Sequence, residues 1–206
     1  MAFFRTILTL VLLAVAASVA AAQLVKSGEY GSLTIGKDAK GRLTGHFFEA
    51  LGVEDEGKPR FTCGFLLQAE PSADGEYTVT TWHPNSPAEP IFGKLIAVSG
   101  GVLLRLDEAH GGCGMVAPDI SSEDGQRFEL TSAGDWIAAG WVRSQQAFFH
   151  KEAKASTRER AFIVKDDLVV VMARRGDWAD VKFTNSAGRT TRGWIKLEDL
   201  YPDEPF

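Results

Sequence analysis

The chain has 206 residues, of which 45% are apolar and 24% are charged, so it can bury an ordinary hydrophobic core in one large domain or two small ones. Its formal charge of −5 and its lack of any run of Lys or Arg exclude phosphate-based binding of nucleic acid. The same features exclude attachment to a membrane surface through a basic helix.

Residues 1–22 have the pattern of a signal peptide. Arg5 supplies a short positive region, residues 6–19 form an apolar run, and Ala20-Ala21-Ala22 provides the small residues of a cleavage site. Cleavage after Ala22 would leave 184 residues and, without Arg5, a formal charge of −6. We therefore expect an exported protein, most simply a periplasmic one, with no membrane span after the signal is removed.

The two cysteines, Cys63 and Cys113, both lie in the exported part, and we expect them to form one disulfide. Such a bond would stabilise the chain by roughly 4 kcal/mol in the chain-entropy model. The alternative is a reactive thiol beside His110, which would require a lowered thiol pKa.

From residue 23 to residue 150 the sequence alternates short apolar runs with turns, as antiparallel strands do. Phe61, Cys63, Phe65 and Leu67 recur at a period of two, which places Cys63 on the core face of its strand. We therefore predict a disulfide-stabilised antiparallel β-barrel or sandwich-like domain over residues 23–150. Residues 136–142 fit neither the strand period nor the helix period clearly.

The polar residues 151–158 are expected to be a linker, and residues 159–206 a second, smaller domain. Here short runs rich in Val, Ile, Phe and Trp are separated by charged or glycine-containing turns, which predicts a small antiparallel barrel. The fold class is accordingly all-β. The expected strands cover residues 161–164, 168–172, 178–183 and 193–195.

The order of these strands, with Gly176-Asp177-Trp178 and Gly193-Trp194-Ile195, resembles a bacterial SH3-like (SH3b) domain. Asp166 occupies a turn position where such sequences often have glycine. The resemblance implies an envelope protein, because several SH3-like domains bind cell-wall peptides, while many only pack against a neighbouring domain.

The first domain is similar, through Phe61-x-Cys63-x-Phe65, Trp82-x-Pro84 and Gly111-Gly-Cys113, to exported bacterial proteins that carry an SH3-like tail. In outline, a small disulfide-containing exported β-barrel is also similar to periplasmic lysozyme inhibitors. That likeness is one of architecture, and architecture does not determine function.

No catalytic or metal-binding arrangement is apparent in the sequence. The four histidines are scattered without metal-ligand spacing, and of these His83 and His110 are the better site candidates, whereas His46 and His150 are expected at the surface. A Cys113–His110 pair lacks the helix start that would lower the thiol pKa. We predict no enzymatic activity, no cofactor and no bound metal.

Binding remains as the expected function. Trp82, beside His83, is the tryptophan most expected at the surface, and Trp178 is equally compatible with the core or with a groove wall. We therefore expect a periplasmic protein that binds a protein or a peptidoglycan-derived ligand, plausibly as an inhibitor or immunity-type factor against a wall-degrading enzyme. The alternatives are a carrier of a small apolar ligand inside the first barrel and a cysteine cell-wall hydrolase.

Overall fold

The computed structural model describes residues 24–53, 57–72 and 75–202. The predicted signal peptide, residues 1–22, lies outside the described residues. Across these residues the chain is nearly all β and forms two curled antiparallel sheets, which confirms the predicted fold class. None of the helices in these ranges is long and apolar enough to cross a membrane.

The first sheet has nine strands, and each of the first eight pairs with its neighbour in the sequence. They are β1 (Gly28–Tyr30), β2 (Leu33–Lys37), β3 (Leu43–Val53), β4 (Pro59–Pro71), β5 (Glu76–His83), β6 (Ser86–Val98), β7 (Gly101–Leu106), β8 (Gln126–Glu129) and β9 (Ser132–Ala133). β8 pairs with β7 and β9 pairs with β1, although only Leu130 and Thr131 separate β8 from β9. This segment therefore joins the two edges, and the sheet curls into a barrel.

Aromatic and aliphatic side chains fill the interior of the barrel. Phe47 stacks on Phe65 with ring centroids 5.1 Å apart and meets Phe128 edge-on at 5.8 Å. Both Phe47 and Phe65 are fully buried. A barrel of about eight strands has an interior that side chains can just fill, and this one is filled by its own residues.

Two short helices, α1 (Cys113–Val116) and η1 (Pro118–Ser121), follow β7 and pack against β4, β3 and the β7–β8 pair. Their buried residues Cys113, Val116 and Ile120 belong to the barrel core. We call residues 108–121 the disulfide segment, because Cys113 is bonded to Cys63 of β4 as predicted.

The second sheet has seven strands in the order β12-β11-β15-β14-β13-β10-β16. They are β10 (Ala138–Val142), β11 (Gln146–His150), β12 (Arg158–Val164), β13 (Leu168–Arg175), β14 (Trp178–Thr184), β15 (Thr190–Lys196) and β16 (Leu200–Tyr201), with short helices η2 (Ala155–Thr157) and η3 (Leu197–Asp199). Its core contains Phe149, Ile163, Val181 and Ile195. The four strands expected from the sequence lie within β12 to β15.

The division between the sheets does not coincide with the predicted division at residues 151–158. β10 and β11 precede that segment yet pair within the second sheet, and the segment itself connects β11 to β12. The first sheet ends at Ala133 and the second begins at Ala138. Apolar periodicity marks where strands are but carries no information on which strands pair.

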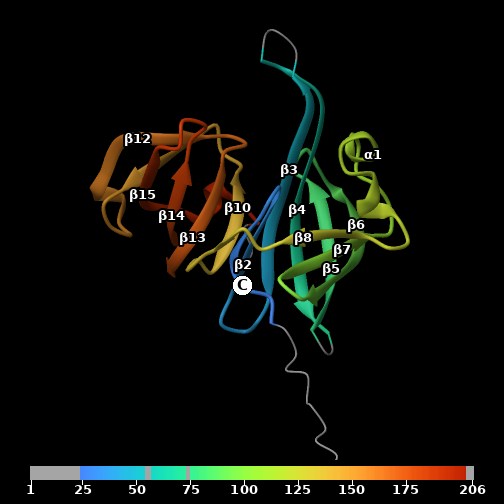
Figure 1. Cartoon of the computed structure of the whole chain (residues 1–206). Helices are drawn as coiled ribbons and strands as arrows, with labels where there is room; N and C mark the ends of the chain where they lie inside the picture. Colours follow the sequence, from blue (N-terminus) through green and yellow to red (C-terminus); the bar gives the residue numbers. More distant parts are fainter. Residues whose placement is uncertain (1–23, 54–56, 73–74, 203–206) are drawn as a thin grey trace, which may run out of the picture.

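The outer face of β10 packs against β2 and β3, so the two sheets stand side by side (Figure 1). Trp136 Nε1 donates a hydrogen bond to the Ile35 carbonyl at 2.8 Å, and the Ala139 amide donates to Thr44 Oγ1 at 3.0 Å. The first bond ties the segment before β10 to the barrel, and the second joins β10 of the second sheet to β3 of the first.

Candidate functional site

A pocket of about 530 Å³ opens where the end of β5 and the start of β6 meet the disulfide segment. Its wall includes His83, Ser86, Glu89, Ile91, Glu108 and His110. The disulfide holds one side of this pocket in place, because Cys113 lies three residues after His110 and is bonded to β4. We call it the barrel-end pocket.

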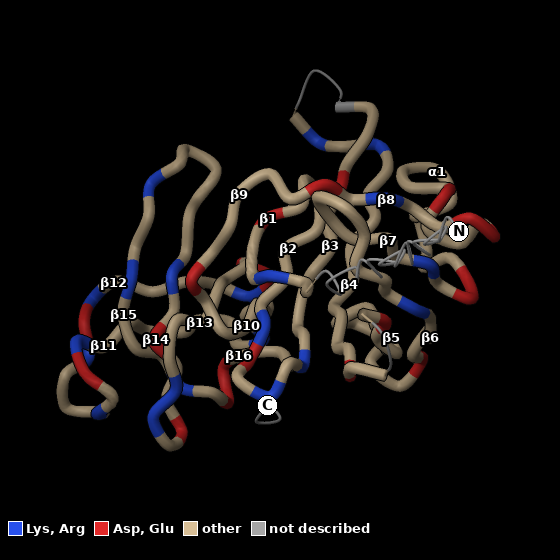
Figure 2. The backbone as a smooth tube through the Cα atoms, turned by 60° about the horizontal axis from the view of Figure 1, so that its bottom comes forward, with Lys and Arg blue, Asp and Glu red and all other residues tan. Residues whose placement is uncertain are grey.

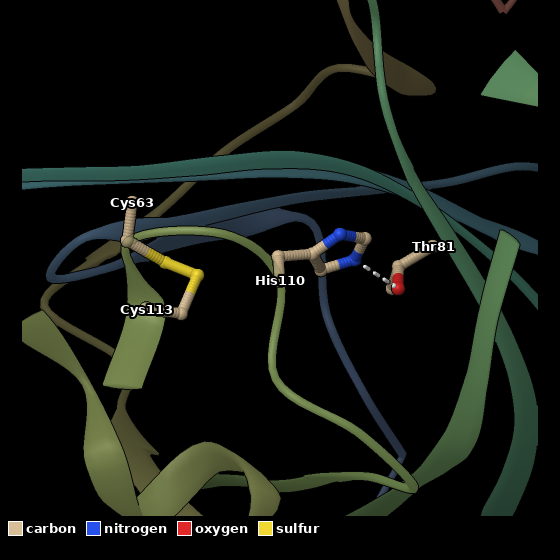
Figure 3. Close-up of a disulfide and its surroundings, with 4 residues drawn as sticks. All are labelled: Cys63, Thr81, His110 and Cys113. Atoms are coloured by element: carbon tan, nitrogen blue, oxygen red, sulfur yellow. Dashed lines mark hydrogen bonds between the residues drawn. A yellow bond between two sulfur atoms is a disulfide. The ribbon is translucent and has the colours of Figure 1, made fainter. Parts of the chain in front are cut away.

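His110 lies deep in this pocket and is held in one orientation. Its side chain is 7% exposed, and its ring stacks on Phe65 with centroids 4.9 Å apart. Its Nε2 lies 2.7 Å from Thr81 Oγ1 (Figure 3). Both contacts come from residues on the inner face of the barrel wall.

The hydrogen-bond partners of Thr81 determine the tautomer of His110. A threonine hydroxyl has a single hydrogen, and Thr81 donates it to the Ile91 carbonyl at 3.0 Å. His110 Nε2–H must therefore be the donor in the bond to Thr81 Oγ1, and Nδ1 carries the lone pair.

Burial lowers the pKa of His110 to about 4, with a smaller lowering effect from nearby His83. The ring is therefore neutral near pH 7. A base whose pKa is so far below neutrality is poorly matched to proton abstraction at that pH. The site is better suited to accepting a hydrogen bond than to acid–base catalysis.

His83 is the other predicted site residue that reaches the pocket. Its Nδ1 accepts a hydrogen bond from the Asn85 amide at 3.1 Å, and its ring meets Trp141 edge-on at 6.4 Å. The structure thus brings His83 and His110 to one pocket. Among the described residues, no group of three or more His, Cys, Asp or Glu side chains is arranged to hold a metal ion.

Trp82, expected at the surface, is buried, so that prediction is wrong. It is 9% exposed and packs with Leu66 and Trp141 in a small cluster between the two sheets. Neighbouring residues of a strand point to opposite faces of the sheet. Because Thr81 points into the barrel, Trp82 points outward, to the side that the second sheet covers. Sequence reasoning could not anticipate that covering.

His46 and His150, also expected at the surface, are each only 7% exposed, so these predictions are wrong as well. His46 lies two residues after Thr44 on β3, so the two side chains share one face of the strand. Thr44 accepts a hydrogen bond from Ala139 of β10, and the second sheet covers this face of β3. His150 meets Trp178 edge-on, with centroids 4.6 Å apart.

Trp178 lies on the second sheet, apart from the barrel-end pocket, and is half-buried. Trp178 is paired with Lys196 and Trp194 with Asp180, so the two tryptophans point to the same face of the β14–β15 pair. The Arg175 guanidinium lies 5.2 Å from the centroid of the Trp194 ring. This cluster is a second aromatic surface, separate from the pocket.

Neither Glu89 nor Glu108 was predicted from the sequence as a site residue, although both line the pocket. Their positions in the sequence give no signal, because Glu108 simply follows Asp107 and Glu89 stands between Pro87 and Pro90 with no distinctive spacing. The two glutamates lie far apart along the chain, and only the pairing of β5, β6 and β7 brings them to one wall.

Cys113 begins the short helix α1, contrary to the expectation from the sequence, but both cysteines form the disulfide and neither is available as a thiolate nucleophile. No protein-family model, curated protein or solved structure matches this chain.

Proposed function

We propose that this chain is an exported, non-enzymatic binding protein that engages a protein partner through the barrel-end pocket. The observation that carries the proposal is the pocket itself, an open site whose wall is held by a disulfide and by the His110–Thr81 bond. Such preorganisation favours binding because little conformational freedom is lost on association.

The partner class that fits this proposal is a wall-degrading enzyme of the cell envelope, with this chain as its inhibitor or immunity-type factor. A disulfide between Cys63 and Cys113 supports a compartment outside the reducing cytoplasm, as the signal-peptide pattern does. The filled barrel interior argues against the alternative of a carrier for an apolar ligand.

The test is a pull-down from periplasmic extract with oxidised protein beginning at Gln23, followed by a turbidity assay of wall lysis by the captured enzyme. We compare the wild type with a pocket variant, His83→Ala/Glu108→Ala, and with Trp178→Ala on the second sheet. We expect capture and protection of the wall to be lost in the pocket variant and kept in Trp178→Ala. Capture that is unaffected by the pocket variant would contradict the proposal.

A second candidate function is direct binding of cell-wall peptides by the second sheet, which we propose as an SH3-like module. The half-buried Trp178 against His150, with Arg175 beside Trp194, favours it. In that case purified wall fragments bind the wild type and the pocket variant equally, and binding is lost in Trp178→Ala.

A further inference from the structure

We propose that the barrel-end pocket binds a positively charged organic group, namely the guanidinium or ammonium of an Arg or Lys side chain on the protein partner. The inference rests on the binding function proposed above and names the chemistry that the same site recognises. Three features of the pocket support it: its carboxylates, the acceptor atom of His110 and its apolar wall.

The carboxylates of the pocket have no cation of their own. Glu89 comes from β6 and Glu108 from the disulfide segment, and neither forms a salt bridge with another described residue. The pocket wall contains no Lys or Arg. Acidic residues also lie on the loops beside α1, close to basic residues of the neighbouring strands (Figure 2).

His110 supplies an independent indication of the ligand. Its ring is neutral, and its Nε2–H is committed to Thr81, so the remaining polar atom is the Nδ1 acceptor. The described residues place no donor on Nδ1 and do not seal it from solvent. An acceptor of this kind, in a side chain that lines the pocket, is available to an N–H donor of the ligand.

The apolar part of the wall suits the stem of such a side chain. Pro90, Ile91 and Ala109 line the pocket beside the polar groups. Lys and Arg place their methylene stems along apolar surface while the charged head meets polar groups. A divalent metal ion fits less well, since the described residues offer no set of three ligands.

The probe that tests this is n-butylguanidinium, with n-butylurea as a neutral analogue of similar shape. Both are titrated into ¹⁵N-labelled oxidised protein, and the ring nitrogens of His110 and the amides of Ala109 and Gly111 are followed by NMR. We expect saturable shifts with butylguanidinium, with a Kd in the millimolar range, and none with butylurea.

Three variants locate the cation. Glu89→Gln and Glu108→Gln are each expected to weaken binding about two- to fivefold, as exposed ion pairs do, and the double variant about four- to twenty-fivefold if the two effects add. Glu123→Gln, an exposed carboxylate on a separate concave surface beside Arg105, is the matched control and should leave the affinity unchanged.

The inference would be overturned if butylurea caused the same shifts as butylguanidinium, or if the double variant bound butylguanidinium as tightly as the wild type. It would also be overturned if butylguanidinium shifted only residues outside the pocket. Absence of any shift in a correctly folded protein would do the same. If the pocket nevertheless captures a wall enzyme in the pull-down, the proposed function stands and the cation inference alone fails.

Discussion

At the scale of single residues, the buried histidines determine how this protein responds to acid. His46 is 7% exposed, and its Nδ1 has no hydrogen-bond partner among the described residues. Burial lowers its pKa from 6.5 to about 4, as it does for His110. Both rings are therefore uncharged in the folded protein near neutral pH.

The consequence is a loss of stability as the pH falls. The pKa of each histidine is lower in the folded chain than in the unfolded chain, so between pH 6.5 and about 4 the unfolded chain binds more protons. The stabilisation is complete above pH 6.5 and declines toward pH 4. For the fully buried His46 the difference in pKa corresponds to about 3 kcal/mol.

We predict that His46→Leu reduces the loss of unfolding free energy between pH 7 and pH 4 by about 3 kcal/mol relative to the wild type. Leucine has no proton to gain and suits an apolar interface. Urea unfolding at both pH values measures the effect, and the double variant with His110→Leu should flatten the profile further. An identical pH profile in wild type and His46→Leu would refute this explanation.

At the scale of elements, the helical part of the disulfide segment is positioned mainly by the disulfide and by two buried side chains. α1 has four residues and no side-chain cap, so its position depends on Cys113 and on the burial of Val116 and Ile120. A helix this short is not stable by itself. The bond to Cys63 therefore both stabilises the chain and positions the pocket wall.

We predict that Cys63→Ala/Cys113→Ala lowers the unfolding free energy by about 4 kcal/mol, since the bond closes a loop spanning 50 residues. Guanidinium chloride unfolding measures this, and a reducing agent should destabilise the wild type by a similar amount. The same reagent should have no effect on the double variant, and an effect there would show that its action is not on this disulfide.

At the scale of the whole molecule, the two sheets act as one packed unit. Leu66, Trp82 and Trp141 are shared between the sheets, and Gly36 of β2 lies directly against Ala138 of β10. A Cβ added at Gly36 would overlap backbone atoms of Ala138, which cannot move aside as a flexible side chain can. Glycine at this position allows the sheets to approach closely.

We predict that Gly36→Ala destabilises the protein by about 1–3 kcal/mol, the usual cost of overpacking. Gly114→Ala is the matched control, because a Cβ at Gly114 has no neighbour within 4 Å. Thermal unfolding compares the two variants. If Gly36→Ala were no less stable than Gly114→Ala, the close packing of β2 on β10 would not be required.

The local pattern of the sequence was sufficient to predict the disulfide and most of the strands, but not β10, whose residues fit neither period clearly. Cys63 alternates with Phe61 and Phe65, and this period of two placed it on the core face, where it meets Cys113. The turn at Asp166 was also recognised, and its φ of 72° is the left-handed conformation that glycine usually adopts. These features depend on residues close together in the sequence.

What only the tertiary structure decided is which strands pair and which faces are covered. β10 and β11 belong to the second sheet. β10 covers the face of β3 that carries His46 and the side of β5 that carries Trp82. Glu89, Glu108 and His110 likewise meet only after three strands have paired. A periodic sequence distinguishes two faces of a strand, but contacts between distant segments determine whether the polar face meets solvent or a second sheet.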